Sequence, residues 1–69
     1  MFLVWFDDTP KKASTDKAWG AIAAYRERYG HQPTVMMVNE ADAPIEIGGI
    51  DVQVRSTVQR NNFWVGYAE

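Results

Sequence analysis

Sixty-nine residues allow one domain, so we expect residues 1–69 to fold as a single unit. The chain has no cysteine, which excludes disulfides, thiolate metal sites and cysteine nucleophiles. Its formal net charge of −2 argues against a nonspecific nucleic-acid binder. The longest apolar run, residues 1–6, is far shorter than the roughly 20 residues of a membrane span. It also lacks the basic segment of a signal peptide, so we expect a cytoplasmic protein with no membrane partner.

The first strand is predicted at residues 1–6, Met-Phe-Leu-Val-Trp-Phe, which are apolar at every position. Such a run is typical of a strand buried on both faces. An amphipathic helix is predicted over Thr15–Tyr29, with Ser14 or Thr15 as its N-cap and Gly30 as the residue that ends it. A second apolar run follows at Thr34–Val38, so the opening predicts a parallel β-α-β unit.

The second half of the chain predicts further strands. Ile45–Ile47 indicates a short extra strand before the turn at Gly48-Gly49. Residues 50–54 alternate apolar and polar side chains, and Phe63–Tyr67 forms the last apolar run. The predicted fold class is α/β (α+β): a small two-layer sandwich of order β-α-β-β-β, with one helix on a mixed sheet. We expect that sheet to be parallel at its centre and antiparallel toward the C-terminus.

Acidic residues follow both strands of the predicted β-α-β unit. Asp7 and Asp8 follow the first strand, and Glu40 and Asp42 follow the second. Parallel strands bring such residues to one edge of the sheet, where carboxylates can hold Mg²⁺ for phosphodiester chemistry. The alternative is that these are ordinary polar strand ends. A Mg²⁺-dependent phosphodiesterase with Asp7 and Asp8 as metal ligands is therefore our third hypothesis, and we assign no catalytic residue and no cofactor.

Basic and polar residues precede two aromatic residues near the C-terminus. Arginine beside exposed aromatic rings binds phosphates and stacks bases, and asparagine reads base edges. A polar turn before a core strand has the same composition. The second hypothesis is a nucleic-acid-binding accessory protein, and the residues proposed to contact nucleic acid are Arg55, Arg60, Asn61 and Asn62.

One helix covers one face of a sheet, yet the strands at residues 1–6 and 34–38 are apolar on both faces. We expect the uncovered face to carry Leu3 and Trp5 with either Val35 and Met37 or Met36 and Val38. Trp64 joins this face, because it differs in parity from Phe63 and Val65. A contiguous exposed apolar patch usually marks an interface. The alternative is that the 40–49 loop or the C-terminal residues fold over it.

The outward face of the helix carries Gly20 and Ala24, one turn apart. Glycine within a helix costs about 1 kcal/mol relative to alanine, and small residues let another backbone approach closely. The preferred hypothesis is therefore a non-enzymatic interaction module that self-associates, as a dimer, or docks on a larger protein through the uncovered sheet face. The residues proposed to bind the partner are Leu3, Trp5, Gly20, Ala24 and Trp64.

Two resemblances accompany these patterns. Residues 4–7, Lys11-Lys12 and Tyr29-Gly30 resemble the opening of small ferredoxin-like proteins of CRISPR adaptation. That family's second helix has no counterpart in residues 45–69, so the resemblance implies a shared β-α-β opening and no function. The stretches Trp5–Asp8 and Asn62–Gly66 make the chain similar to short uncharacterised prokaryotic proteins, which implies a small prokaryotic or phage protein.

Overall fold

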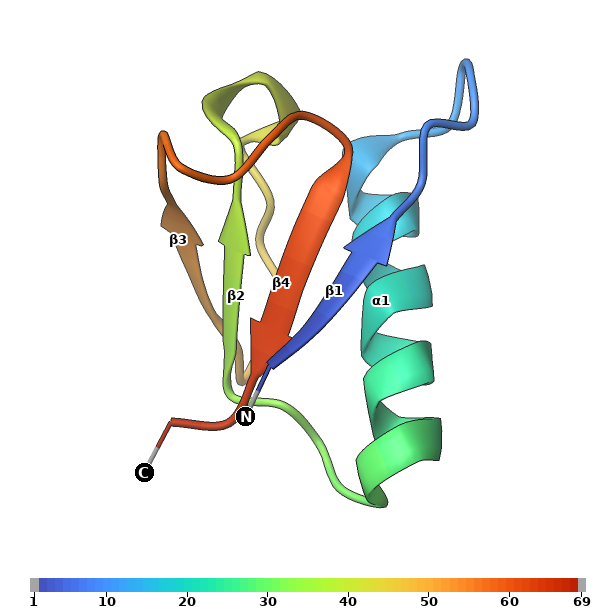
Figure 1. Cartoon of the computed structure of the whole chain (residues 1–69), viewed down its shortest axis with the longest axis vertical. Helices are drawn as coiled ribbons and strands as arrows, with labels where there is room; N and C mark the ends of the chain where they lie inside the picture. The colour runs from blue at the N-terminus through green and yellow to red at the C-terminus, as the bar shows by residue number, and fades with distance from the viewer. Residues whose placement is uncertain (1, 69) are drawn as a thin grey trace.

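The structure is a computed structural model that describes residues 2–68 (Figure 1). Strand β1 (Phe2–Phe6) leads through helix α1 (Ser14–Tyr29) to strand β2 (Val35–Val38). A short 3-10 helix, η1 (Glu40–Asp42), precedes strands β3 (Asp51–Val54) and β4 (Asn62–Gly66). The predicted fold class and element order are confirmed, whereas Met1 of the predicted first strand lies outside the described residues. The predicted extra strand at 45–47 is wrong, because this segment is extended without pairing.

The four strands form one sheet in the order β1-β4-β2-β3. Strand β4 pairs antiparallel with both β1 and β2, so β1 and β2 run parallel to each other without being neighbours. The parallel pair is β2 and β3, at one edge of the sheet. The prediction of a parallel centre is therefore wrong, whereas the predicted antiparallel pairing holds for the C-terminal strand β4. The last strand inserts between the two strands of the β-α-β unit, and residues 39–50 supply roughly the dozen residues that a parallel crossover needs.

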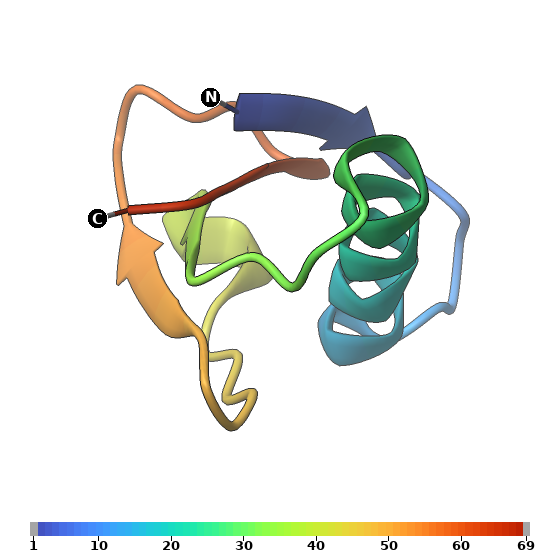
Figure 2. The same cartoon turned by 90° about the horizontal axis from the view of Figure 1, so that it is seen from below.

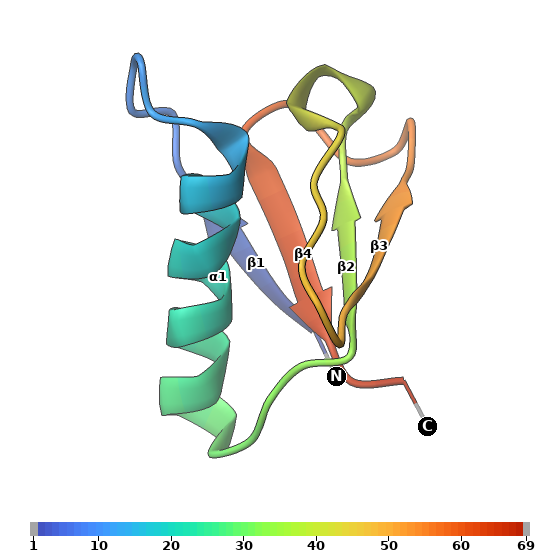
Figure 3. The ribbon, with the colours of Figure 1, turned by 180° about the vertical axis from the view of Figure 1, so that it is seen from behind.

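Two segments cover the same face of this sheet, which we call the covered face. Helix α1 lies over β1 and β4, and the extended segment 43–50 lies over the rest (Figures 2 and 3). Ile45, Ile47 and Ile50 of this segment join the helix residues in one core cluster, so the 40–49 loop does not fold over the second face. The strand residues buried in that cluster are Met36, Val38, Phe63 and Val65.

Helix α1 is amphipathic, and it begins one residue earlier than predicted. Its N-cap is Ala13, which has no side-chain hydrogen bond, so the predicted Ser14 or Thr15 cap is wrong. Gly30 ends the helix as predicted: its φ of 76° is left-handed and its N–H donates to the Arg26 carbonyl over 2.8 Å. Glycine adopts this conformation without a steric penalty, which explains its place here.

Candidate functional site

No helix or strand covers the second face of the sheet among the described residues, and we call it the open face. Its most exposed apolar side chains come from the neighbouring strands β1 and β4. The exposed fractions are 43% for Phe2, 50% for Val4, 59% for Phe6 and 37% for Trp64. Val4 and Trp64 are cross-strand partners, and Met37 of β2 lies on the other side of Trp64, half-buried. The uncovered face and the position of Trp64 on it agree with the sequence-based prediction.

Leu3 and Trp5 do not lie on this open face. Both pack against the core cluster on the covered face, where their cross-strand partners are the buried Val65 and Phe63. The predicted placement of Leu3 and Trp5 is therefore wrong, and Phe2, Val4 and Phe6 take their place. The physical reason is that β1 is apolar at every position, so hydropathy does not distinguish its two faces.

Gly20 and Ala24 also take part in contacts within the chain. A Cβ atom built on Gly20 lies 3.4 Å from the indole Nε1 of Trp5, so this glycine faces the strand beneath the helix. The prediction that Gly20 faces outward is wrong, because the large indole occupies the space beside it. Ala24, one turn further on, is half-buried.

The ring of Phe2 lies directly over Gly66 on the open face. These two residues are cross-strand partners, and a Cβ atom at Gly66 would lie 2.7 Å from two carbons of the Phe2 ring. The aromatic ring thereby shields a glycine backbone that has no side chain of its own. Sequence reasoning missed this pair, although a glycine inside a strand often indicates a close approach of another group.

Polar residues border the apolar part of the open face on two sides. At one end, the 55–61 connection and strands β1 and β4 form a recess of about 210 Å³, lined by Val4, Thr57, Gln59, Asn62 and Trp64. On β3, Gln53 donates from Nε2 to Asp51 Oδ2 over 2.7 Å and accepts from the Arg55 guanidinium. The open face thus has an apolar area on β1 and β4 with polar residues at one end and along β3, and protein interfaces combine apolar and polar parts in this way.

The four residues proposed to contact nucleic acid do not form one basic patch. Arg55 and Arg60 are exposed, but the Arg55 guanidinium bonds to its own strand, at the Val54 carbonyl over 3.0 Å. Asn61 has a left-handed φ of 65°, donates its N–H to the buried Asp42 carboxylate over 2.8 Å and accepts from Lys17 Nζ over 3.1 Å. Asn62 lines the recess described above. Asn61 therefore holds its loop against η1 and α1.

The acidic residues that follow β1 and β2 lie at the same end of the sheet. Asp7 and Asp42 accept hydrogen bonds from neighbouring loops there. Asp7 accepts from the Thr9 hydroxyl over 2.6 Å, from the Thr9 N–H over 3.0 Å and from Lys12 Nζ over 2.9 Å. These hydrogen bonds, from the Thr9 hydroxyl first and then Lys12, hold the pKa of Asp7 well below its usual range. Asp8 and Glu40 are exposed. Across residues 2–68, no group of three or more histidine or acidic side chains is arranged to hold a metal ion.

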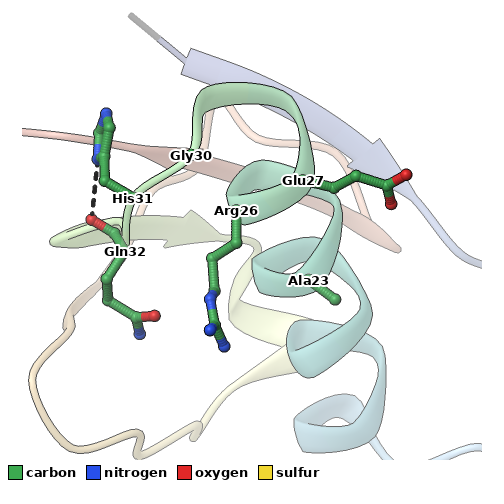
Figure 4. A pocket seen from close by; sticks show the side chains of 6 residues that line it. All are labelled: Ala23, Arg26, Glu27, Gly30, His31 and Gln32. Atoms are coloured by element: carbon green, nitrogen blue, oxygen red, sulfur yellow. Dashed lines mark hydrogen bonds between the residues drawn. The ribbon is translucent and has the colours of Figure 1, made fainter.

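A second recess, of about 510 Å³, lies at the C-terminal end of α1 (Figure 4). Its six lining residues include Arg26, Glu27 and His31, and His31 Nδ1 lies 3.3 Å from the Gln32 carbonyl oxygen. These six residues include no hydroxyl and no thiol, and their nucleophilic or acid–base groups are the Glu27 carboxylate and the His31 imidazole. Both side chains are exposed.

Comparison with known proteins adds no relative: no family model, no curated protein and no solved structure matches this chain. Within the described part of the chain, no helix has both the length and the hydropathy that crossing a membrane requires. The open face is therefore the candidate site on its own geometry.

Proposed function

We propose that this protein is a non-enzymatic interaction module that docks a larger protein through the open face of its sheet. The observation that carries the proposal is the group of exposed apolar side chains at Phe2, Val4, Phe6 and Trp64 on two neighbouring strands. Aromatic anchors at the centre of a patch supply most of the energy in protein interfaces. Trp64 and the two phenylalanines are the anchors we expect.

The size of the patch supports a docking role. With about 150–250 Å² for a fully exposed aromatic side chain, the four exposed fractions correspond to roughly 400 Å² of apolar surface. A standard interface buries about 800 Å² on each partner. The apolar centre supplies about half of that area, and the rim of Gln53, Arg55, Thr57 and Asn62 supplies polar contacts around it.

A protein partner fits the charge of this face better than a nucleic acid does. Strands β1 and β4, which carry the four apolar side chains, contain no lysine and no arginine. Beside them on the β3 side, Arg55 donates a hydrogen bond to Gln53, which in turn donates one to Asp51. Binding to a phosphate backbone requires several cationic contacts. The aromatic side chains suit base stacking, but the charges that would hold the backbone are missing from these strands.

Site-specific photo-crosslinking tests this proposal. Benzoylphenylalanine replaces Trp64 on the open face in one variant and Glu46, which is exposed on the opposite side, in the control. We expect a protein crosslinked from position 64 and not from position 46, and about a tenfold weaker affinity of that purified protein for Trp64→Ala. Crosslinks to nucleic acid would support the second hypothesis, and equal crosslinking from both positions would contradict any role of this face.

A further inference from the structure

The outer edge of β1 is a second exposed feature of the sheet, separate from the open face. Strand β1 is at one end of the sheet, and its neighbour in the described structure is β4. Asp7 donates its N–H to the Asn61 carbonyl over 2.9 Å, in register with the β1–β4 pairs. Because backbone groups alternate in direction along an antiparallel pair, Leu3 and Trp5 bond to β4. The N–H and C=O groups of Phe2, Val4 and Phe6 therefore point away from the sheet.

This edge lacks the features by which proteins prevent edge pairing. Residues 2–6 contain no charged residue and no proline, and their register with β4 is continuous, without a bulge. The other edge, β3, differs: Asp51 and Arg55 flank it, and Gln53 links their side chains by hydrogen bonds. Charges of this kind discourage a second strand from adding to β3.

We propose that β1 pairs antiparallel with β1 of a second copy of this chain, which continues the sheet across a two-fold axis at Val4. In this register Val4 lies opposite Val4 of the second copy, and Phe2 lies opposite Phe6. Every cross-strand pair is apolar, so the contact between identical strands places no like charges together. The outward N–H and C=O groups of the three residues become the hydrogen-bond partners of the same groups in the second copy.

The pairing also enlarges the open face. The side chains of Phe2, Val4 and Phe6 point to that face, so two copies joined at β1 place their apolar patches side by side. The joined patches exceed the roughly 400 Å² of one copy but fall short of twice that area, because the paired side chains of Phe2, Val4 and Phe6 bury part of one another. Self-association through the edge thereby leaves the open face available for a different protein.

Proline substitutions at the two edges test the proposal. Val4→Pro removes an outward N–H of β1 without removing a bond to β4. Val54→Pro is the matched control. Asp51 and Arg55 donate their N–H groups to the Thr34 and Val38 carbonyls, so the Val54 N–H points outward at the other edge. Val54 is 46% exposed and Val4 is 50% exposed. Circular dichroism verifies that both variants are folded.

Light scattering across a concentration series gives the readout. We expect the unmodified chain and Val54→Pro to reach twice the monomer mass of 7.8 kDa, and Val4→Pro to remain at the monomer mass. A monomeric unmodified chain at millimolar concentration, or a dimeric Val4→Pro, would overturn the proposal. Trp64→Ala should stay dimeric; its loss of the dimer would indicate that the copies meet through their open faces instead, and the edge proposal would be wrong.

Amide exchange in the unmodified chain provides a test that needs no variant. In the monomer the Val4 amide faces solvent, whereas in the edge-paired dimer it donates a hydrogen bond. We expect its exchange to slow by roughly tenfold or more as the concentration rises from micromolar to millimolar, while the Trp5 amide, bonded to β4 at all concentrations, changes little. Exchange at Val4 that is independent of concentration while a dimer forms would exclude this mode of pairing.

Discussion

Both faces of the sheet carry aromatic and aliphatic side chains, and the two faces have opposite environments. On the covered face Phe63 and Val65 are fully buried, and on the open face Phe6 and Val4 are 59% and 50% exposed. In β1, which is apolar at every described position, composition therefore does not decide which face is buried. Burial is decided by the two covering segments, α1 and residues 43–50, which lie on one side of the sheet (Figure 3).

This difference separates residues that stabilise the fold from residues that are free to bind. A fully buried aromatic side chain contributes its whole transfer free energy to folding. A partly exposed one contributes only a part, and the remainder is gained when a partner buries it. Three tests probe this separation and a fourth probes the polar end of β1, beginning with the largest expected effect.

Phe63→Ala and Phe6→Ala compare the two faces with the same change of side chain. Truncating the buried Phe63 should lower the free energy of unfolding by about 3–5 kcal/mol, because it leaves a cavity in the core. Truncating the exposed Phe6 should lower it by about 1 kcal/mol or less, because this ring is already 59% exposed. Urea denaturation followed by fluorescence measures both, and similar losses would contradict the assignment of the faces.

Gly66→Ala probes the contact that organises the open face. A methyl group at this position would lie 2.7 Å from the Phe2 ring, so the ring must move away from the strand. We expect a loss of about 1–2 kcal/mol in the free energy of unfolding. The double variant Phe2→Ala/Gly66→Ala should lose less than the sum of the two single variants, since the clash requires both groups. Additive losses would show that Phe2 does not cover Gly66.

Gly20→Ala tests the packing of the helix on the covered face. The added methyl group would lie 3.4 Å from Trp5 Nε1 and 3.8 Å from Cε2, which are ordinary van der Waals contacts. Alanine favours the helix over glycine by about 1 kcal/mol, so the free energy of unfolding should rise by about 0.5–1 kcal/mol. The midpoint of thermal unfolding measures the change, and a lower midpoint would mean that the indole lies closer to the helix than described.

Asp7→Asn tests the carboxyl group at the polar end of β1, which belongs to neither apolar face. The ionisation of this group makes the stability of the fold depend on pH. The hydrogen bonds from Thr9 and Lys12 keep the pKa of the folded Asp7 carboxyl low, whereas the unfolded chain takes up this proton near pH 4. The stability that Asp7 contributes is therefore complete above about pH 4 and is lost as the pH falls toward the folded pKa.

We expect the smallest effect of the four at this site, because Lys12 is exposed and solvent screens the pair. Thermal unfolding between pH 7 and pH 2.5 should show a steeper loss of stability at acid pH for the unmodified chain than for Asp7→Asn. Parallel pH profiles would indicate that other carboxyl groups account for the acid sensitivity.

Local patterns predicted the individual elements well. The apolar run before Asp7, the helical spacing that ends at Gly30, and the turn at Gly48-Gly49 each depend on neighbours within a few residues. The short strand at 45–47 was wrong, because strand pairing requires a neighbour that the local sequence does not contain. The N-cap was wrong because the helix begins one residue earlier, after Ala13, which has no capping side chain.

The sequence by itself determined that this chain has one helix and several strands. It also determined that one face is left uncovered, because one helix cannot cover both faces of two strands that are apolar throughout. The tertiary structure alone decided the order of the strands, with β4 inserted between β1 and β2, and the face of β1 that meets the helix. Pairing and facing depend on contacts between residues far apart in the chain. Where every residue of a strand is apolar, burial of either face is favoured by the hydrophobic effect. The face that is buried is the one whose side chains pack in the core: Trp5 packs beside Gly20, in a cluster that includes the isoleucines of segment 43–50.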